Sequence, residues 1–477
     1  SGWNTSEAGQ PVNLTCANNL LFFNQYDSGG GVKEFWVTNG TAADTRIVRK
    51  FNTNSWQGMF GRVAFRNQIF FVIRTVDFGY ELWHSDGTAE GTIFLKDINP
   101  GNGDSYPCNF MIADKQLYFF ANDNVHGNEL WKTDGTTSGT QLVKDINPGP
   151  QSSASWNKDV MSSVFHDGRL YFSADDGVHG TELWKSDGTE AGTVMVKDIN
   201  AGPAASLPSN YIVNAGIIYF TSAGSSYTTY SQFTQTTTIY NTELFRTDGT
   251  ENGTHLVKDI NQGPQGSGLR NLMVFNNQLV FAASEAAGGS DLYTSDGTAE
   301  GTHPLMDDKT FTNVYNFLKT ERAIHFFANN GTHGFELWKT TGYKEGTLKL
   351  SSSLPEWGNT QPSSEMVLAG SNLYFTTNSN YKLWRLALNE DLVDSESLFS
   401  VFPNPFYNQL EIFLFQNLSG PVRLTIYDGI GKRVFENEVQ FTEHAIVNGL
   451  NTLAPGIYFL DITCNNKKFT KKIIRQY

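Results

Sequence analysis

One unit of about 48 residues recurs along most of the chain, and this repetition constrains the fold more than any other feature. The tripeptide Glu-Leu-Trp, or a close variant of it, starts at Glu34, Glu81, Glu129, Glu182, Glu243, Asp291, Glu336 and Lys382. In the best copies, such as residues 182–200, the tripeptide leads into Asp-Gly-Thr, a Gly-Thr pair and Lys-Asp-Ile-Asn. Self-similarity at a nearly constant period indicates a repeat architecture.

Each unit has the pattern of four short β-strands. In the unit around Trp131 the strands are predicted at 109–113, 117–121, 129–133 and 140–146. Asp134-Gly135-Thr136 is typical of a tight turn, because Asp can accept backbone hydrogen bonds and Gly tolerates positive φ. The composition agrees, since charged residues are only 17% and the chain contains 45 glycines. Helical 3.6-residue periodicity is not seen, so we expect an all-β fold.

A single four-stranded sheet has two faces and cannot bury both of them alone. Stacked sheets that close into a ring bury these faces and leave no exposed end, so the repeat predicts a β-propeller of four-stranded blades. Eight copies of the third strand are present, but no fourth strand follows the last copy at 381–388. We favour eight blades, the last completed by the segment around Trp3, with seven blades and an additional hairpin as the alternative.

The repeated unit resembles the bacterial ELWxxDGT repeat family over roughly residues 12–388. Some copies depart from the motif, since Phe245 and Tyr293 replace Trp and residues 341–343 replace Asp-Gly-Thr. The resemblance implies a propeller in a surface or secreted protein. We therefore predict a propeller domain at 1–388.

The sequence changes character after Leu388. Residues 389–397 are acidic and polar, which is typical of a linker. Residues 398–477 lack Asp-Gly-Thr turns and predict a small Ig-like antiparallel β-sandwich, with a hairpin turn at 428–431. Its strand segments, in this order, resemble the type A C-terminal sorting domain of substrates of the type IX (Por) secretion system.

This second resemblance implies a Bacteroidetes-type source and export across the outer membrane, to the cell surface or the medium. The implied partners are the outer-membrane translocon and its β-barrel shuttle protein. By the same analogy, the residues that carry the export signal are Pro403, Asn404, Pro405, Lys471, Lys472, Ile473 and Ile474. The alternative is that these residues only hold the sandwich together.

The charge and hydropathy of the chain exclude several classes of partner and a position across a membrane. A net charge of −14 disfavours binding to nucleic acid or to anionic membrane surfaces. No apolar run approaches the roughly 18–20 residues of a membrane span, so we do not expect the chain to cross a bilayer. The chain starts at Ser1 rather than Met, which indicates a removed export signal or a cloning scar. Three cysteines, an odd number, favour free thiols.

No catalytic constellation stands out. The motif glutamates, aspartates and tryptophans recur in nearly every unit, so we interpret them as hydrogen-bonding, turn-capping and packing groups, whereas catalysis needs one asymmetric cluster. His126, His179 and His333 recur in equivalent loops of separate units, too far apart to share one zinc ion. The loops at 122–124 and 175–177 are weak candidates for calcium, and no other cofactor is expected. We therefore expect a protein that is not an enzyme.

The interruptions of the repeat indicate a ligand face. Residues 221–242 form an insertion rich in Thr, Ser and Tyr, at the loop that joins the second and third strands. The candidate ligand-binding residues are Trp56, Trp156, Trp357, Tyr227 and Tyr230. Aromatic rings beside hydroxyl groups suit sugar binding, although these residues would also suit packing against their own loops. Our leading hypothesis is a non-enzymatic binding or adhesion module, with a polysaccharide hydrolase or lyase, or a passive passenger, as alternatives.

Overall fold

The structure is a computed structural model. It describes residues 12–26, 32–52, 59–154, 163–230, 236–263, 265–285, 289–306, 311–331, 334–350, 366–369, 372–376, 383–388, 399–402, 406, 408–414, 421–440, 444–464 and 467–475. These residues form β-strands, turns and two short 3-10 turns, Lys344–Gly346 and Leu450–Thr452. The all-β prediction is confirmed. Among the described residues no helix has the length and apolarity that crossing a bilayer requires.

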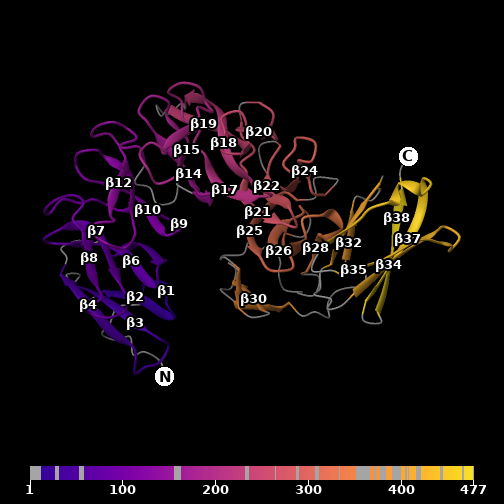
Figure 1. The fold of residues 1–477 in the computed structure, drawn as a ribbon, viewed down its shortest axis with the longest axis horizontal. Helices are drawn as coiled ribbons and strands as arrows, with labels where there is room; N and C mark the ends of the chain where they lie inside the picture. The colour runs from indigo at the N-terminus through magenta and orange to yellow at the C-terminus, as the bar shows by residue number, and fades with distance from the viewer. Residues whose placement is uncertain are drawn as a thin grey trace. The chain divides into compact units, whose positions relative to one another are not determined.

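The chain divides into two compact units. One comprises residues 1–274, 283–286 and 297–302, and the other comprises residues 275–282, 287–296 and 303–477. Figure 1 labels the strands along the chain.

The first unit contains five four-stranded sheets, each made of consecutive antiparallel strands. The strands of the first three sheets are β1 (Val12–Ala17), β2 (Leu20–Tyr26), β3 (Val32–Thr38) and β4 (Arg46–Asn52); β5 (Phe60–Phe65), β6 (Gln68–Thr75), β7 (Gly79–Ser85) and β8 (Ile93–Lys96); and β9 (Cys108–Ala113), β10 (Gln116–Asn122), β11 (Asn128–Thr133) and β12 (Gln141–Lys144). Those of the fourth and fifth are β13 (Val164–His166), β14 (Arg169–Asp175), β15 (Thr181–Ser186) and β16 (Val194–Lys197); and β17 (Ser209–Asn214), β18 (Ile217–Tyr230), β19 (Thr236–Thr247) and β20 (His255–Lys258). The predicted unit of four strands is confirmed.

Three further sheets follow along the chain. The sixth sheet, which supplies residues to both units, contains β21 (Arg270–Phe275), β22 (Gln278–Ala283), β23 (Asp291–Ser295) and β24 (His303–Pro304). The seventh contains β25 (Asn313–Lys319), β26 (Ile324–Asn329), β27 (Phe335–Thr340) and β28 (Leu348–Lys349), and the eighth contains β29 (Val367–Ala369), β30 (Asn372–Thr376) and β31 (Leu383–Ala387). The fold is therefore that of propeller blades. The blade count is not confirmed, because the segment around Trp3 lies outside the described residues.

The cores of the first unit lie between successive sheets rather than within them. Phe35 of β3 and Phe71 of β6 approach to a ring-centroid distance of 4.8 Å, although they belong to different sheets. Each fully buried phenylalanine contributes about 1.5–3 kcal/mol relative to exposure. The motif tryptophans Trp83, Trp131 and Trp184 are 5–6% exposed and belong to these clusters. The prediction that they serve packing is confirmed.

A cation from each of these sheets binds a turn of the next sheet. A cationic side chain of the fourth strand donates to the backbone carbonyl of the second threonine in the next sheet's Asp-Gly-Thr…Gly-Thr turn. The donor–acceptor pairs are Arg49–Thr92, Lys96–Thr140, Lys144–Thr193, Lys197–Thr254 and Lys258–Thr302, at 2.9, 2.6, 2.9, 2.7 and 2.5 Å. A hydrogen bond from a charged donor is stronger than a neutral one, so it sets the position of one sheet against the next.

The C-terminal residues form a sandwich of two antiparallel sheets. One contains β32 (Phe399–Phe402), β33 (Leu410–Leu414) and β36 (His444–Val447), and the other contains β35 (Arg433–Gln440), β34 (Pro421–Asp428), β37 (Gly456–Cys464) and β38 (Lys467–Arg475). Ile412, Leu424, Leu460 and Ile473 are fully buried in one core between the sheets. The predicted hairpin is confirmed, since Asp428 Oδ1 accepts from two backbone amides of the turn, at 3.1 and 2.9 Å.

The cation contacts generate a stability prediction. We expect Lys144→Met to lower stability by about 1–3 kcal/mol, because it keeps the apolar stem but leaves the Thr193 carbonyl without its charged donor. Thermal unfolding of the full chain measures the effect. Lys115→Met, at an exposed turn, is the matched control and should leave the midpoint unchanged. Equal midpoints for the two variants would contradict the role of the contact.

Candidate functional site

Most of the motif glutamates are buried at the junctions between sheets, whereas Glu34 is partly exposed and pairs with Lys50. Glu129 is 0% exposed, and its carboxylate accepts from the backbone amides of Ile146 and Ser153, at 2.8 and 2.9 Å. Both amides lie on the segment that leads from the third sheet to the fourth. The equivalent Glu81 accepts from the Ser105 hydroxyl at 2.6 Å. The prediction that these glutamates make hydrogen bonds between blades is confirmed.

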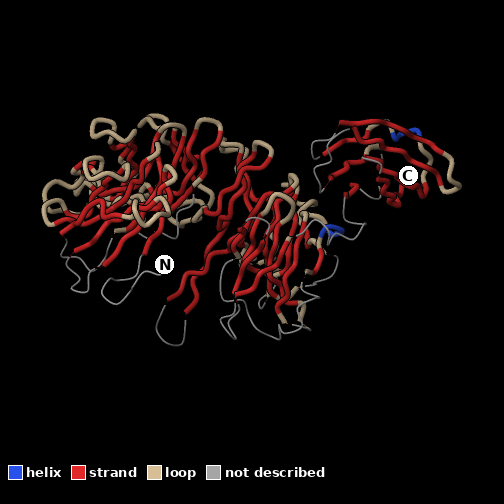
Figure 2. The backbone as a smooth tube through the Cα atoms, turned by 90° about the horizontal axis from the view of Figure 1, so that it is seen from below, coloured by secondary structure: helices blue, strands red, loops and turns tan. Residues whose placement is uncertain are grey.

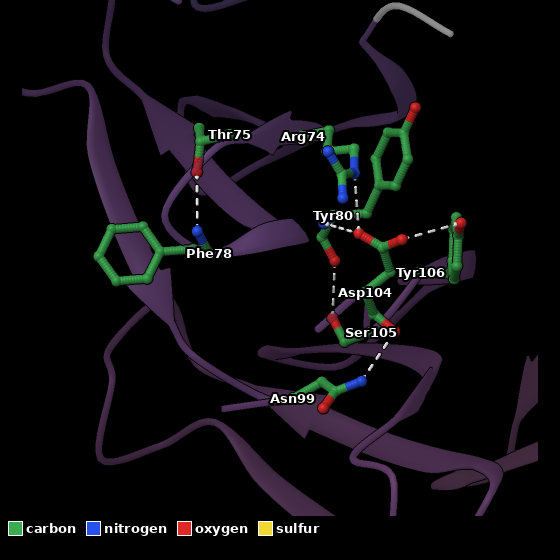
Figure 3. A network of polar contacts seen from close by, with 8 residues as sticks. All are labelled: Arg74, Thr75, Phe78, Tyr80, Asn99, Asp104, Ser105 and Tyr106. Carbon is green, nitrogen blue, oxygen red and sulfur yellow. Dashed lines mark hydrogen bonds and ion pairs between the residues drawn. The ribbon is translucent and has the colours of Figure 1, made fainter. Parts of the chain in front are cut away.

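Figure 3 shows the junction after the second sheet in detail. Asp104 accepts from Arg74 Nε at 3.1 Å, from the Tyr80 amide at 2.9 Å and from the Tyr106 hydroxyl at 3.1 Å. The Ser105 hydroxyl donates to the Tyr80 carbonyl at 3.0 Å. The polar groups of this junction are therefore engaged in holding the chain between two sheets.

Burial makes three of the motif glutamates weaker acids than a glutamate in water. Desolvation raises the pKa of Glu81 to about 8 and the pKa of Glu129 and Glu182 to about 7, although each carboxyl accepts several hydrogen bonds. A perturbed carboxyl often marks a catalytic site. Here the same arrangement recurs in consecutive sheets, so it indicates a structural role.

The Asp-Gly-Thr turns are capped as predicted. Asp134 Oδ1 accepts from the Thr136 amide at 2.9 Å and from its hydroxyl at 2.7 Å. These bonds hold the pKa of Asp134 below its ordinary value. A Cβ at Gly139 would lie 2.0 Å from Asp134 Oδ1, which explains the glycine of the Gly-Thr pair. The motif aspartates therefore stabilise turns.

Two of the motif histidines also contact an aspartate of their own loop. His126 Nδ1 lies 2.7 Å from Asp123 Oδ2, and His179 makes the same contact with Asp176 at 2.8 Å. The hydrogen bond to Asp123 raises the pKa of His126 above its ordinary value. His333 lies outside the described residues.

The two loops considered for calcium use their carboxylates in turns. Oδ1 of Asp123 and Oδ1 of Asp176 each accept from two backbone amides. The part of the chain that the structure describes contains no group of three or more His, Cys, Asp or Glu side chains that could hold a metal. Cys16 and Cys108 are free, the first exposed and the second buried.

The predicted ligand face is described only in part. Trp56, Trp156 and Trp357 lie outside the described residues. Tyr227 and Tyr230 lie on β18, where Tyr227 pairs with Ile239 and Tyr230 pairs with Thr236. The side chains of both tyrosines lie outside the described part of the structure, so their role as ligand-binding residues stays a prediction.

The predicted export residues divide into two groups. Pro403, Asn404 and Pro405 lie outside the described residues, and the others lie on β38. Ile473 is 0% exposed in the sandwich core, so it serves folding. Lys472 and Ile474 alternate with it and lie on the outer face of the sheet.

That outer face is apolar where β37 and β38 meet. Ile474 pairs with Ile457, and Lys472 pairs with Phe459. Ile457, Phe459 and Ile474 are 47, 39 and 37% exposed. The sequence had singled out neither Ile457 nor Phe459. Which residues of β37 lie beside those of β38 depends on the register of the two strands, which only the structure shows.

A pocket of about 290 Å³ lies between β5 and β9, which are the first strands of the second and third sheets. Its lining includes Phe60, Arg62 and Val63 of β5 and Asn109 and Phe110 of β9. Both strands carry a left-handed residue, Gly61 or Asn109. The sequence did not predict this pocket. Its only sign in the sequence is the Asn or Gly that recurs early in the first strand of a unit, where the backbone bends.

The sequence comparisons identify the C-terminal module. The model of the family described as "Secretion system C-terminal sorting domain" matches residues 400–476. The chain is accordingly a substrate of the type IX secretion system, exported to the cell surface or the extracellular space. No curated protein matches the chain.

Among solved structures, the chain is similar to a puromycin hydrolase, with 11% identity, 78% of this chain and 60% of that chain covered, and a TM-score of 0.37. It is also similar to a structure from a study of two prolyl endopeptidases, with 9% identity, coverages of 86 and 55%, and a TM-score of 0.36. A third is the β-propeller domain of the Trilobed protease from Pyrococcus furiosus, with 9% identity, coverages of 74 and 98%, and a TM-score of 0.32. The chain thus spans little more than half the length of the first two.

These similarities contradict the prediction that the chain is not an enzyme, because the similar structures include hydrolases. The prediction rested on the lack of a recognisable motif. One fold carries many functions, and a catalytic site depends on geometry rather than on a motif in the sequence, so that lack excludes nothing. Identities of 9–11% and TM-scores of 0.32–0.37 assign no reaction to this chain.

The raised pKa values predict a pH dependence of stability. Between the unfolded pKa near 4.5 and the folded values of about 7–8, the folded chain binds more protons than the unfolded chain. Stability from these groups is therefore complete below about pH 4.5 and is lost as the pH rises through 7–8. We expect the midpoint temperature of thermal unfolding to decrease as the pH is raised from 5.5 to 8.5.

A variant separates these glutamates from the other titrating groups. Glu81→Gln cannot titrate, so its midpoint should fall less over that range than the midpoint of the wild type. Glu90→Gln, at an exposed turn, should follow the wild type. The same slope in all three proteins would show that Glu81 does not titrate in this range.

Proposed function

We propose that this chain is a glycan-binding propeller of the cell surface or the medium. Residues 1–388 form the binding module, residues 389–397 a linker, and residues 398–477 the export signal. The sorting-domain match at 400–476 carries the export half of the proposal. The translocon and its β-barrel shuttle are the partners of the sorting domain.

The outer face of β37 and β38 supports a recognition role for the last strand. Exposed apolar side chains that gather on a folded domain are typical of an interaction surface. Ile457, Phe459 and Ile474 gather in this way, and Lys472 adds a charge beside them. We assign this face to the shuttle.

The insertion in the fifth sheet supports glycan binding by the propeller. It interrupts a repeat whose other features serve turns, junctions and packing, so it is free to vary for function. Its tyrosines and hydroxyl-bearing residues match what sugar rings require.

The export half predicts the effect of surface substitutions on β38. We expect Lys472→Ala combined with Ile474→Ala to lower the amount of exported protein about tenfold, because both side chains lie on the proposed recognition face. Immunoblots of the cell surface, the medium and the periplasm of a host with a type IX system measure the distribution. The folded sandwich should persist, since neither side chain lies in its core.

Ile446→Ala is the matched control, because Ile446 is 49% exposed on β36 of the other sheet and should leave export unchanged. Removal of residues 398–477 should retain the chain in the periplasm. Normal export of the truncated chain would refute the assignment of the signal.

The binding half predicts retention by a polysaccharide. The full chain should bind at least one polysaccharide on a glycan array at physiological salt, whereas serum albumin, another acidic protein, should bind none. Release of reducing ends in the same mixtures distinguishes binding alone from turnover. Failure to bind any of the polysaccharides would overturn the binding proposal.

A further inference from the structure

The first strands of successive sheets are neighbours in the first unit. β5 contacts both β1 and β9, and β9 contacts β13. Figure 1 labels β1, β9 and β17 along the inner side of this unit, and Figure 2 shows its strands in red, side by side. Each of these first strands lies at the edge of its own sheet. A side chain of one first strand can therefore reach the first strand of the preceding sheet.

The register identifies one equivalent position in these strands. In each of the first five sheets, one residue of the first strand pairs with the third residue of the second strand. The residue directly before it occupies what we call the bridging position. The residues at the bridging position of the five sheets are Leu14, Arg62, Phe110, Ser163 and Tyr211.

Large side chains at the bridging position cross to the preceding first strand. Arg62 donates to the backbone carbonyl of Asn13 on β1. Phe110 lies over Gly61 of β5, where a Cβ would be 2.8 Å from Phe110 Cε2. Asn13 and Gly61 are the left-handed residues of their strands, with φ of 58° and 53°. The bridging side chain thus fills the space beside the left-handed residue of the preceding sheet.

Ser163 differs from its counterparts, because a serine side chain is too short to cross in this way. By the pattern of the neighbouring sheets, the residue at this position would meet Asn109, which is the left-handed residue of β9. The pocket of about 290 Å³ has both Asn109 and Ser163 in its lining. The space that a large bridging side chain would fill is therefore open here.

The size of the pocket limits the ligand to a single ring. A volume of about 290 Å³ equals roughly ten water molecules at about 30 Å³ each. It lies at the lower end of the range of about 300–1,000 Å³ that is typical of small-molecule sites. The pocket can therefore hold one six-membered ring with its substituents, but not several linked rings.

The lining combines aromatic and polar side chains. Phe60 and Phe110 supply aromatic rings, and Asn109 and Ser163 supply an amide and a hydroxyl group that both donate and accept hydrogen bonds. A sugar ring has an apolar side that stacks on an aromatic ring and hydroxyl groups that need polar partners. The arrangement therefore suits a sugar ring better than a purely apolar molecule.

The charge of the lining favours a neutral ligand. Among the lining residues that the structure describes, Arg62 alone carries a charge. Its guanidinium group donates to the backbone carbonyls of Asn13 and Met59, so it is directed towards the first sheet. Recognition of a carboxylate relies on a cationic side chain aimed at it, above all arginine in a bidentate geometry.

We propose that the pocket between β5 and β9 binds one neutral sugar ring, which stacks on Phe110 and forms hydrogen bonds with Asn109 and Ser163. This inference rests on the proposed glycan binding and adds a subsite for a single ring, with its residues and its preference for a neutral sugar. The small side chain of Ser163, where the neighbouring sheets have Phe110 and Tyr211, creates the room for that ring.

Saturation-transfer difference NMR of the full chain tests the inference. D-Glucose, D-galactose, D-mannose and N-acetyl-D-glucosamine are the neutral probes, and D-glucuronate is the acidic one. We expect saturation transfer to at least one neutral probe. Ser163→Phe should abolish this transfer, because the new ring copies Phe110 and fills the pocket. Phe110→Ala should weaken the affinity about tenfold, since it removes the stacking surface.

Leu14→Phe is the matched control. It places the same phenylalanine at the bridging position of the first sheet, where Leu14 is 61% exposed and is not part of the pocket lining. Its saturation transfer should equal that of the wild type. The thermal midpoints should also be equal for the wild type, Ser163→Phe and Leu14→Phe, which excludes misfolding as the cause of a lost signal.

The outcomes separate this inference from the proposed function. Saturation transfer that survives both Ser163→Phe and Phe110→Ala overturns the assignment to the pocket, and transfer to D-glucuronate alone overturns the neutral class. A wild type that binds a polysaccharide on the array but gives no transfer to a neutral probe overturns the subsite and leaves glycan binding intact. A wild type that binds neither overturns the proposed glycan binding as well.

Discussion

The hydrogen bond from a lysine of one sheet to a turn carbonyl of the next is the contact on which the array of the first unit depends. Apolar burial between the sheets is the larger stabilising term, but it has no preferred direction. Lys144 adds direction, because its ammonium group must meet the carbonyl of Thr193. The same threonine pairs its hydroxyl with Ser186 at 2.7 Å, so one residue both closes its own turn and receives the neighbouring sheet.

Repetition explains why so few conspicuous residues are candidates for function. The motif glutamates hold junctions, the aspartates hold turns, and the tryptophans pack between sheets. A buried carboxyl with a pKa of about 7–8 would attract attention in an enzyme, yet here Glu81, Glu129 and Glu182 share one environment. Function is therefore expected where copies differ, as in the long hairpin of the fifth sheet and on the outer face of the C-terminal sandwich.

Much of the local structure could be predicted from the sequence. The strands around Trp131 and the turns at Asp134 and Asp428 follow from alternation, turn chemistry and period. The left-handed residue of several first strands was not predicted, although Asn109 and Asn210 share a φ of 55°. An asparagine in a strand is compatible with both ordinary and left-handed backbone, and the packing of the neighbouring strand decides between them. The exclusion of enzymatic activity failed because it used a missing motif as evidence.

The sequence by itself determined the repeat, the strand content, the turn chemistry and the sorting module, because each of these depends on residues close together in the chain. The tertiary structure alone decided which side chains from distant parts of the sequence contact one another. It paired Lys96 with Thr140, and it placed Ile473 in a core and Ile474 on a surface. Such contacts depend on register and on the stacking of sheets, where a shift of one residue exchanges the two faces of a strand.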